Sequence, residues 1–232
     1  MRVGIMQPYL FPYIGYFQLI KAVDLFVLHD DVQWIKGGWI NRNQILVEGR
    51  AMRWTLPVSK TSSLNLINEC EVADLAGSRC RILRQIQNAY RRAPFFAEVM
   101  PLITDIINQQ EKNVAKYVLN SLEKLSSYMG MSTKLTMSSV LEKDDSSKGQ
   151  ERVIAICATL GADEYVNPIG GAELYCKDRF KESGIDLYFL QPGEIEYKQY
   201  GDSFVSNLSI IDVLMFNSLE SIHEMLNLYA LI

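Results

Sequence analysis

The N-terminal part of the chain alternates between short apolar runs and turn-forming segments. Val3–Met6 is an apolar run of strand length, and Leu25–Leu28 is a second one. Between them lie a loop marked by prolines and a glycine, residues 7–16, and an apolar spacing of helical period over Phe17–Val23. This order predicts the opening of a right-handed βαβ unit with adjacent, parallel, buried strands.

The middle of the chain changes from strand period to helical period. Gln44–Val47 and Arg53–Val58 predict a hairpin around Glu48–Arg50, and Ile67–Val72 predicts a further extended piece. From Gly77 to Tyr128 the spacing is helical. Pro94 interrupts it, and two further helices are expected over about 97–109 and 113–128.

The C-terminal part again alternates strands with helices. Strands are expected at Thr133–Leu141, Glu164–Asn167 and Ile185–Leu190, and helices at Gln150–Leu160, Ala172–Ser183 and Leu219–Ala230. The pattern predicts an α/β fold with a mostly parallel, Rossmann-like sheet. We expect a single domain, residues 1–232, with a helical insertion at about 77–130.

Composition and charge narrow the classes of partner. The 232 residues are 48% hydrophobic and 22% charged, and the net charge of −4 comes from closely mixed acids and bases. These values predict a globular core and give no reason to expect nucleic acid as a partner. No apolar run reaches the length of a membrane span, and the N-terminus lacks a signal-peptide cleavage pattern, so we expect a cytoplasmic protein. Two histidines and no CxxC pair predict no metal site of the zinc type.

Polar residues follow the first two predicted strands. Gln7 follows the first, and His29, Asp30 and Asp31 follow the second. In a parallel sheet these carboxyl ends border one crevice, so His29, Asp30 and Asp31 are the candidate catalytic residues. The acids could act as general base or bind Mg²⁺ with a ligand phosphate, and they could equally be solvated side chains of an ordinary loop. Mg²⁺ is therefore a possible cofactor, and no other is assigned.

Three loops supply the remaining candidates for substrate binding. The aromatic loop could line a pocket at a helix N-terminus or simply cap the sheet. The loop 34–42 offers cations beside tryptophans, as a phosphate or a ring would require. The third loop lies between a predicted strand and helix, where phosphate-binding turns occur. The candidates are Gln7, Tyr9, Tyr13, Gly15, Tyr16, Gln33, Trp34, Lys36, Asn41, Arg42, Asn167, Gly170 and Gly171.

Long motifs along the chain carry a family resemblance. The segments MQPYLFPYIGYFQLI (6–20), DLFVLHDDVQWIKGGWINRNQI (24–45), GQERVIAICATLGADEYVNPIGGAELY (149–175) and FVSNLSIIDVLMFN (204–217) resemble the WbqC-like family, which is associated with bacterial O-antigen genes. The resemblance implies a role in assembling O-antigen or another surface polysaccharide.

A second resemblance is to HxGH nucleotidyltransferases, particularly pantothenate synthetase-like ligases. Tyr13-Ile14-Gly15-Tyr16 stands at the HxGH position, and Gln33-Trp34 at a Gln-aromatic position. Both histidines that would contact nucleotide phosphates are replaced by tyrosine. The fold analogy therefore carries further than the ATP chemistry.

Together these features favour an enzyme that forms an amide or ester on a nucleotide-activated amino sugar. A transferase with a preactivated acyl or aminoacyl donor is the second hypothesis, because the HxGH histidines are missing. The third is a non-catalytic protein that binds a nucleotide sugar during assembly. The expected partners are small molecules, a nucleotide sugar or an acyl donor.

Overall fold

A computed structural model describes the whole chain except residues 74–76, 145 and 202. Over the described residues the main sheet has six strands in the order β10-β9-β8-β1-β2-β7. All neighbours are parallel except β9 and β10. The strands of this sheet are β1 (Arg2–Met6), β2 (Leu25–Leu28), β7 (Lys134–Met137), β8 (Glu164–Pro168), β9 (Asp186–Pro192) and β10 (Tyr229–Leu231).

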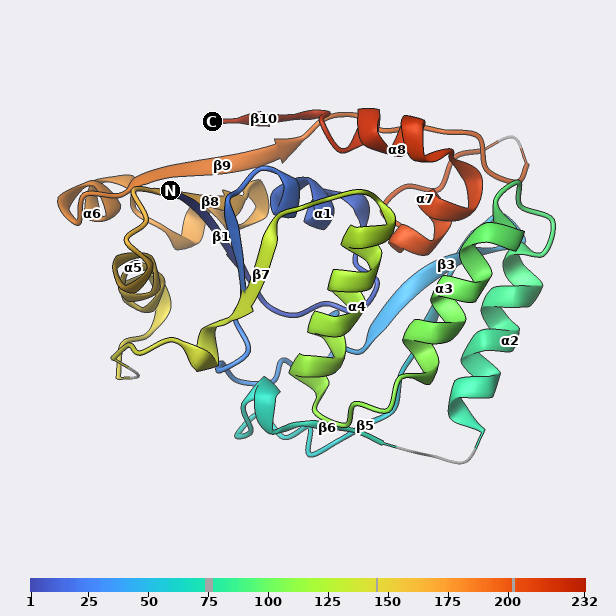
Figure 1. Cartoon of the computed structure of the whole chain (residues 1–232), viewed down its shortest axis with the longest axis horizontal. Helices are drawn as coiled ribbons and strands as arrows, with labels where there is room; N and C mark the ends of the chain where they lie inside the picture. The colour runs from blue at the N-terminus through green and yellow to red at the C-terminus, as the bar shows by residue number, and fades with distance from the viewer. Residues whose placement is uncertain (74–76, 145, 202) are drawn as a thin grey trace.

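Helices cover both faces of this sheet, so the α/β class with a mostly parallel sheet is confirmed (Figure 1). The α-helices are α1 (Ile14–Lys21), α2 (Ser78–Tyr90), α3 (Phe96–Asn108), α4 (Val114–Tyr128), α5 (Gly149–Leu160), α6 (Lys177–Glu182), α7 (Ile210–Phe216) and α8 (Leu219–Met225). Short 3₁₀ helices are η1 (Ile67–Glu69), η2 (Ser138–Val140) and η3 (Ile169–Leu174).

The predicted βαβ opening is confirmed. β1 and β2 are parallel neighbours in register from Val3 opposite Leu25 to Met6 opposite Leu28, and α1 connects them. The helix packs closely on the strands because Gly4 leaves no side chain on that face. A Cβ at Gly4 would lie 3.3 Å from the Phe26 ring.

Alternation along the strands divides the core in two. The α1-side core contains Phe26, Leu28 and Val166 with side chains of α1, α2, α3, α4, α7 and α8. The α5-side core contains Val3, Ile5 and Val27 with side chains of α5 and α6. Successive residues of a strand point to opposite faces, so one short sheet supports both cores.

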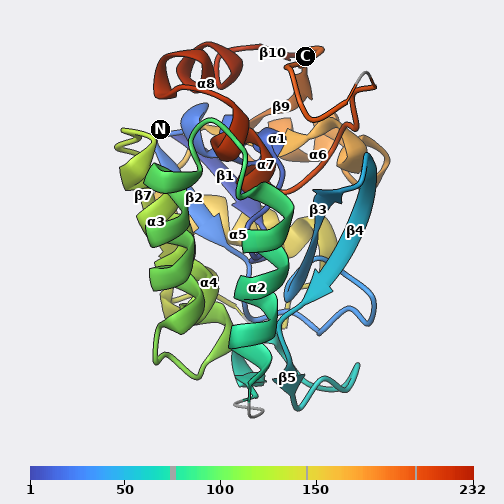
Figure 2. The ribbon, with the colours of Figure 1, turned by 90° about the vertical axis from the view of Figure 1, so that its right-hand side faces the viewer.

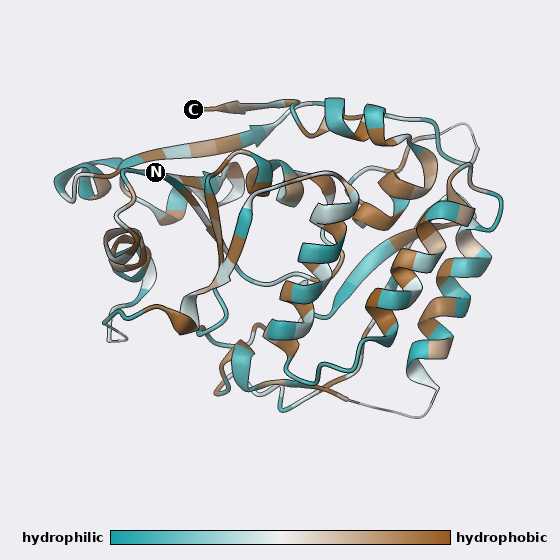
Figure 3. Cartoon of the chain, viewed as in Figure 1, coloured by the Kyte–Doolittle hydropathy of each residue, from teal (hydrophilic) through white to brown (hydrophobic). Residues whose placement is uncertain are grey.

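Two smaller ribbons and a helical layer complete the fold. β3 (Arg42–Val47) and β4 (Arg50–Thr55) form the predicted hairpin, although its second strand begins three residues before the expected Arg53–Val58. Val58 belongs instead to β5 (Val58–Ser59), which pairs with β6 (Glu71–Val72). Figure 2 shows α2, α3 and α4 side by side, with the hairpin next to α2. Figure 3 shows apolar bands along these helices, the pattern of helices that bury one side.

Four local predictions need correction. Ile67–Val72 is not a continuous extended piece, because η1 occupies its first half. The strand expected to reach Leu141 ends at Met137, where η2 begins. A single helix over Ala172–Ser183 was wrong: Tyr175 and Cys176 are extended between η3 and α6, and the Tyr175 ring packs on Phe180.

The fourth correction concerns the C-terminus. The helix α8 ends at Met225, and the chain then forms β10 along β9. The side-chain amide of Gln18 donates hydrogen bonds to the carbonyl oxygens of Met225 and Leu228, both at 2.8 Å, and so fixes the turn. A short apolar segment such as this one suits either structure until a neighbouring strand edge offers hydrogen bonds.

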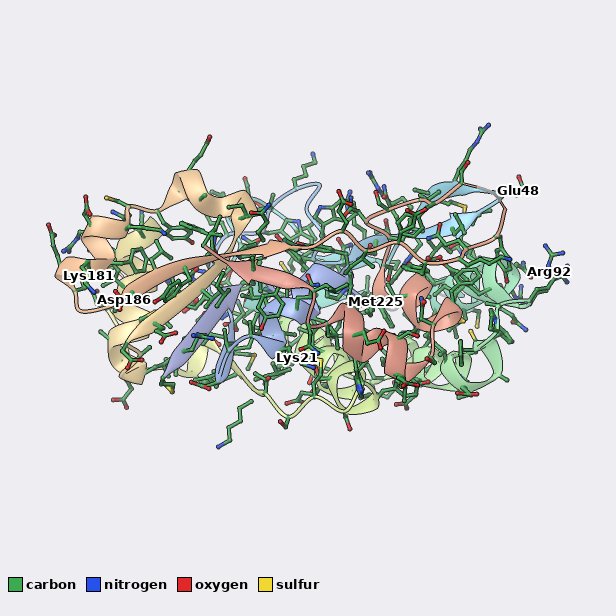
Figure 4. All side chains as sticks on the ribbon, turned by 90° about the horizontal axis from the view of Figure 1, so that it is seen from above. Lys21, Glu48, Arg92, Lys181, Asp186 and Met225 are labelled. Atoms are coloured by element: carbon green, nitrogen blue, oxygen red, sulfur yellow. The ribbon has the colours of Figure 1, made fainter. Side chains whose placement is uncertain are left out.

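Charged side chains lie at both ends of the molecule. Figure 4 shows Lys181 beside Asp186 at one end, where their ion pair measures 2.6 Å, and Arg92 and Glu48 at the opposite end.

Within the described ranges, no helix combines the length and the apolar character needed to cross a membrane.

Candidate functional site

The carboxyl ends of β1, β2 and β7 bring distant polar residues together. β1 lies between β2, which follows it in the chain, and β8, which comes much later. The strand order therefore reverses beside β1, and ligands of open α/β sheets bind at such a point. Gln7 follows β1, His29, Asp30 and Asp31 follow β2, and Ser138 and Ser139 follow β7.

Asp30 is engaged entirely by the end of β7. It is fully buried. One carboxylate oxygen accepts hydrogen bonds from the Ser138 hydroxyl at 3.1 Å and the Ser139 N–H at 3.0 Å. The other accepts from the Ser139 hydroxyl at 2.6 Å. Asp30 thus fastens the ends of two strands and does not line the pocket described below.

The Asp31 carboxylate forms ion pairs with Lys143 and Arg152. Its Oδ2 lies 2.5 Å from Lys143 Nζ and 2.8 Å from Arg152 Nη2, and its Oδ1 accepts from the Ser138 hydroxyl at 2.5 Å. Burial alone would raise the pKa of Asp31, but hydrogen bonds from Lys143, Ser138 and Arg152 outweigh it and lower the pKa to about 2. Asp31 is therefore a carboxylate at neutral pH that holds the cations in place.

His29 is the neutral member of the group. Its Nε2 lies 3.8 Å from Asp31 Oδ1 and has no hydrogen-bond partner among the described residues, although it is buried. Burial is the main cause that lowers the pKa of His29, to about 4. Asp31 opposes this shift and Arg152 supports it. The imidazole is therefore uncharged at neutral pH. Its Nε2 is covered by the surrounding protein, while the side chain as a whole keeps 16% exposure.

A pocket of about 560 Å³ opens beside these residues, and we call it the β1–β2 pocket. Gln7, His29, Asp31 and Gln33 line one side. The start of α5, including Lys148 and Arg152, lines another, and Leu174 and Tyr175 close it. The N–H groups at a helix N-terminus and the two basic side chains favour an anion such as a phosphate or carboxylate.

The other sequence candidates lie in several places. Tyr9, Tyr13 and Gly170 line a second pocket, at the carboxyl ends of β8 and β9. Trp34 is buried in the α1-side core, and Tyr16 is buried there too, with its hydroxyl donating to the Gln7 carbonyl at 2.9 Å. Neither ring is open to a ligand.

Three further polar candidates, Asn41, Arg42 and Lys36, lie away from the pockets. The Asn41 side chain donates to the Leu56 carbonyl at 2.6 Å. Arg42 is half-buried on β3, and Lys36 is exposed. Neither lines any of the pockets described here.

The loop after β8 also has an internal use for its polar and small residues. Asn167 accepts from the Tyr165 hydroxyl at 2.9 Å and donates to the Pro168 carbonyl at 3.0 Å. A Cβ at Gly171 would lie 2.2 Å from the Asn167 amide nitrogen, so this glycine makes room for that side chain. The loop leads into η3 rather than into an α-helix.

Sequence reasoning missed Lys143, Lys148, Arg152 and Tyr175. A signal was present for two of them, because Lys148 lies two residues before the helix predicted at Gln150–Leu160 and Arg152 lies in its first turn, where backbone N–H groups already favour anions. No local signal exists for Lys143 or Tyr175, since only the fold brings Lys143 to Asp31 and Tyr175 to the pocket.

The acidic residues do not form a metal site. Within the part of the chain that the structure describes, no group of three or more His, Cys, Asp or Glu side chains could hold a metal ion. Asp31 faces two cations, and the Asp30 oxygens are occupied by serine hydroxyls and an N–H. This donor set does not fit Mg²⁺, because the carboxylate oxygens are already engaged by the protein.

Fold and pocket define an α/β protein with a polar, cation-bearing pocket at the strand ends. The chain matches the WbqC-like protein family over residues 7–224 and therefore belongs to it, which confirms the resemblance seen in the motifs. A Mycobacterium tuberculosis (strain ATCC 25618 / H37Rv) protein, "Uncharacterized protein Rv1507c", is 32% identical over 221 residues, 93% of each chain. The comparison with solved structures found no match.

Proposed function

We propose that this chain is a cytoplasmic enzyme of bacterial surface-glycan (O-antigen) biosynthesis, which forms an amide or ester on a nucleotide-activated amino sugar. The observation that supports it best is the β1–β2 pocket, whose wall contains the uncharged His29 together with Arg152 and Lys148. The pocket combines groups that bind phosphate with a group that can accept a proton.

The cations would hold the phosphates of the nucleotide. Arg152 is fixed by its 2.8 Å ion pair with Asp31, so it needs little ordering when a ligand arrives. Lys148 is exposed at the start of α5 and can move toward the ligand. A positioned arginine, a flexible lysine and a helix N-terminus together suit a diphosphate.

His29 would accept the proton of the attacking group. The amine or hydroxyl of the sugar attacks the acyl carbonyl carbon, its proton passes to His29, and the leaving group departs with the electron pair of the broken bond. A pKa of about 4 suits a weak base. A bound phosphate places negative charge beside the imidazole and raises that pKa toward the range in which a base works best.

A specific observation favours a preactivated acyl or aminoacyl donor over activation by ATP. The Tyr13 ring lies against Gly15 at the start of α1, since a Cβ there would be 2.3 Å from the ring. The ring therefore covers the backbone that an HxGH enzyme offers to nucleotide phosphates, and Tyr16 is buried. This supports the transferase over the ligase.

Binding of nucleotide sugars tests the phosphate part of the proposal. Calorimetric titration with UDP-linked and dTDP-linked amino sugars should show saturable binding. Lys148→Ala should weaken it by about 1.5–3 kcal/mol, the usual contribution of a charged hydrogen bond. Lys36→Ala, an exposed lysine outside the pocket, is the matched control and should bind as the unaltered protein does.

Turnover tests the catalytic part. With an acyl-thioester or aminoacyl donor, His29→Gln should retain binding and lose product formation, as followed by mass spectrometry of the sugar. If the unaltered protein binds the nucleotide sugar but forms no product with any donor class, the non-catalytic assembly role replaces the enzyme. If it binds no phosphorylated sugar, the proposal fails.

A further inference from the structure

A second pocket lies at the carboxyl ends of β8 and β9, with a volume of about 410 Å³. We call it the β8–β9 pocket. The aromatic side chains of Tyr9, Tyr13 and Trp39 contribute to its wall. Ile169 and Gly170, at the first end of η3, also line it, whereas Leu174 at the last end of η3 lines the β1–β2 pocket. The short helix η3 therefore borders both pockets.

The charge of the two pockets differs sharply. No residue that lines the β8–β9 pocket carries a formal charge, whereas Asp31, Lys148 and Arg152 line the other. A phosphate or carboxylate in the β8–β9 pocket would lose its water without gaining a charged partner, which is unfavourable. The charge distribution favours an uncharged ligand.

The aromatic side chains of the pocket provide ring faces for stacking and hydroxyl groups for hydrogen bonds. The hydroxyls of Tyr9 and Tyr13 make no hydrogen bond within the described residues, and burial raises the pKa of both phenols, so they remain donors at neutral pH. Trp39 is 40% exposed, and the Arg53 guanidinium lies 5.9 Å from its ring centroid. Exposed aromatic faces with free hydroxyls suit a ring that stacks and has polar edges.

The backbone around the pocket is strained and firmly held. Phe11, in the loop that presents Tyr9 and Tyr13, has φ 46°, and Asn207 of the pocket wall has φ 57°. A bulky residue in this conformation costs on the order of 1–3 kcal/mol and persists only where its surroundings fix it. The Phe11 carbonyl accepts from Asn43 Nδ2 at 2.6 Å and from the Ser209 hydroxyl at 2.8 Å. The loop is therefore held rigidly in a conformation that it would not adopt alone.

We infer that the β8–β9 pocket binds an uncharged ring with a stacking face, either a nucleobase or a sugar ring, through Trp39, Tyr9 and Tyr13. The inference rests on the proposed function only in assigning the ring to the nucleotide sugar whose phosphates lie in the β1–β2 pocket. The pocket and its chemistry stand without that assignment.

Tryptophan fluorescence tests the inference directly. Trp34 and Trp54 are buried at 4% and 2% exposure, so a ligand that stacks on Trp39 changes a signal that the other two do not share. We expect a saturable change with uridine, which carries no phosphate, or with methyl N-acetylglucosaminide, which carries no base. The probe that binds identifies the ring.

Two variants locate the binding, measured by calorimetry because the signal of Trp39 is lost. Trp39→Ala should weaken the bound probe roughly 5- to 150-fold, as expected from loss of stacking. Gly15→Ala places a Cβ 2.3 Å from the Tyr13 ring, displaces that ring and should weaken the same probe. Trp39 is exposed, so its replacement should leave the fold intact even if Gly15→Ala does not.

Lys148→Ala separates this inference from the proposed function. It should leave the affinity for uridine or the glycoside unchanged while weakening UDP. If neither probe binds, or if the bound probe ignores Trp39→Ala, the inference is overturned even where nucleotide sugars bind through Lys148. If a probe binds through Trp39 but UDP binds no tighter than uridine, the inference holds and the proposed function fails.

Discussion

At the scale of single residues, neighbouring polar side chains have very different environments. Asp30 and Asp31 are adjacent in the chain, yet serine hydroxyls and an N–H engage one while two cations engage the other. His29 beside them is uncharged because burial outweighs the nearby carboxylate. Such groups link the protonation of the site to the stability of the fold.

His29 should make the free energy of unfolding depend on pH between about 6.5 and 4. Its pKa is lower in the folded state, so the unfolded chain binds more protons in this window. Its stabilising contribution is complete above pH 6.5 and lost as pH falls to 4, about 3 kcal/mol in all. Urea unfolding of the unaltered protein and of His29→Gln should show curves that converge toward pH 4. Curves that stay parallel would contradict the low pKa.

Asp212 is a buried carboxylate that depends on its hydroxyl donors. It is fully buried at the start of α7 and accepts from the Tyr90 hydroxyl at 2.8 Å and the Tyr197 hydroxyl at 2.7 Å. Burial raises the pKa of Asp212, and these hydrogen bonds act against it.

Tyr90→Phe should therefore lower the free energy of unfolding by about 1–3 kcal/mol, because Asp212 loses a donor and the Leu46 N–H loses its acceptor. Urea unfolding with an unchanged slope measures it. Tyr188→Phe is the control, since within the described residues the Tyr188 hydroxyl makes no hydrogen bond, and it should be nearly neutral. Equal effects of the two variants would show that ring packing, not the hydroxyl, matters.

At the scale of elements, the C-terminal strand depends on a contact with α1. β10 is an edge strand, held to β9 by few hydrogen bonds, including Phe189 N–H to the Ile232 carbonyl at 2.8 Å and Ile232 N–H to the Phe189 carbonyl at 3.0 Å. The turn before it is fixed by the two hydrogen bonds from Gln18, a side chain that is fully buried.

Gln18→Ala should release β10 without unfolding the rest of the sheet. The carbonyls of Met225 and Leu228 each lose one of two donors, since the Leu228 and Gly193 N–H groups remain, and the loss costs about 0.5–1.5 kcal/mol per hydrogen bond. Hydrogen exchange should accelerate at the Phe189 and Ile232 amides while the amides between β1 and β2 keep their protection. Gln85→Ala, an exposed glutamine on α2, is the control. Uniform acceleration over the whole sheet would contradict a local role.

At the scale of the whole molecule, one sheet connects two cores. The α1-side core contains both buried tryptophans, Trp34 and Trp54, whereas Phe180 belongs to the α5-side core. The same strands contribute to both, so neither core can lose its packing without exposing the sheet.

Truncations on the two faces should therefore shift the same transition. Leu19→Ala on α1 and Phe180→Ala on α6, both fully buried, should lower the free energy of unfolding by about 2–5 kcal/mol. Tryptophan fluorescence should follow the Phe180→Ala transition as circular dichroism does, although no tryptophan contacts that core. Separate midpoints for the two probes would show that the cores unfold independently.

The sequence by itself determined most helices and strands and the βαβ unit at the start of the chain. The strands Val3–Met6 and Leu25–Leu28 and the helices α3 and α4 were expected close to their observed positions. The helix expected over Phe17–Val23 and the hairpin strand expected over Arg53–Val58 each begin three residues earlier. Long periodic segments are decided by local pattern because each residue contributes to the same buried face. The motifs also carried the family, since they are long and occur along the whole chain.

The tertiary structure alone decided which side chains share a pocket. Asp31 lies more than a hundred positions from Lys143 and Arg152, and no spacing in the chain links it to them until β2, β7 and α5 pack. The same is true of β10, whose short apolar segment forms a strand because β9 offers an unpaired edge. It is also true of Trp39 and Tyr13, which line one pocket only in the folded chain. Contacts between distant segments depend on how the elements pack, and that is a property of the assembled core rather than of any local pattern.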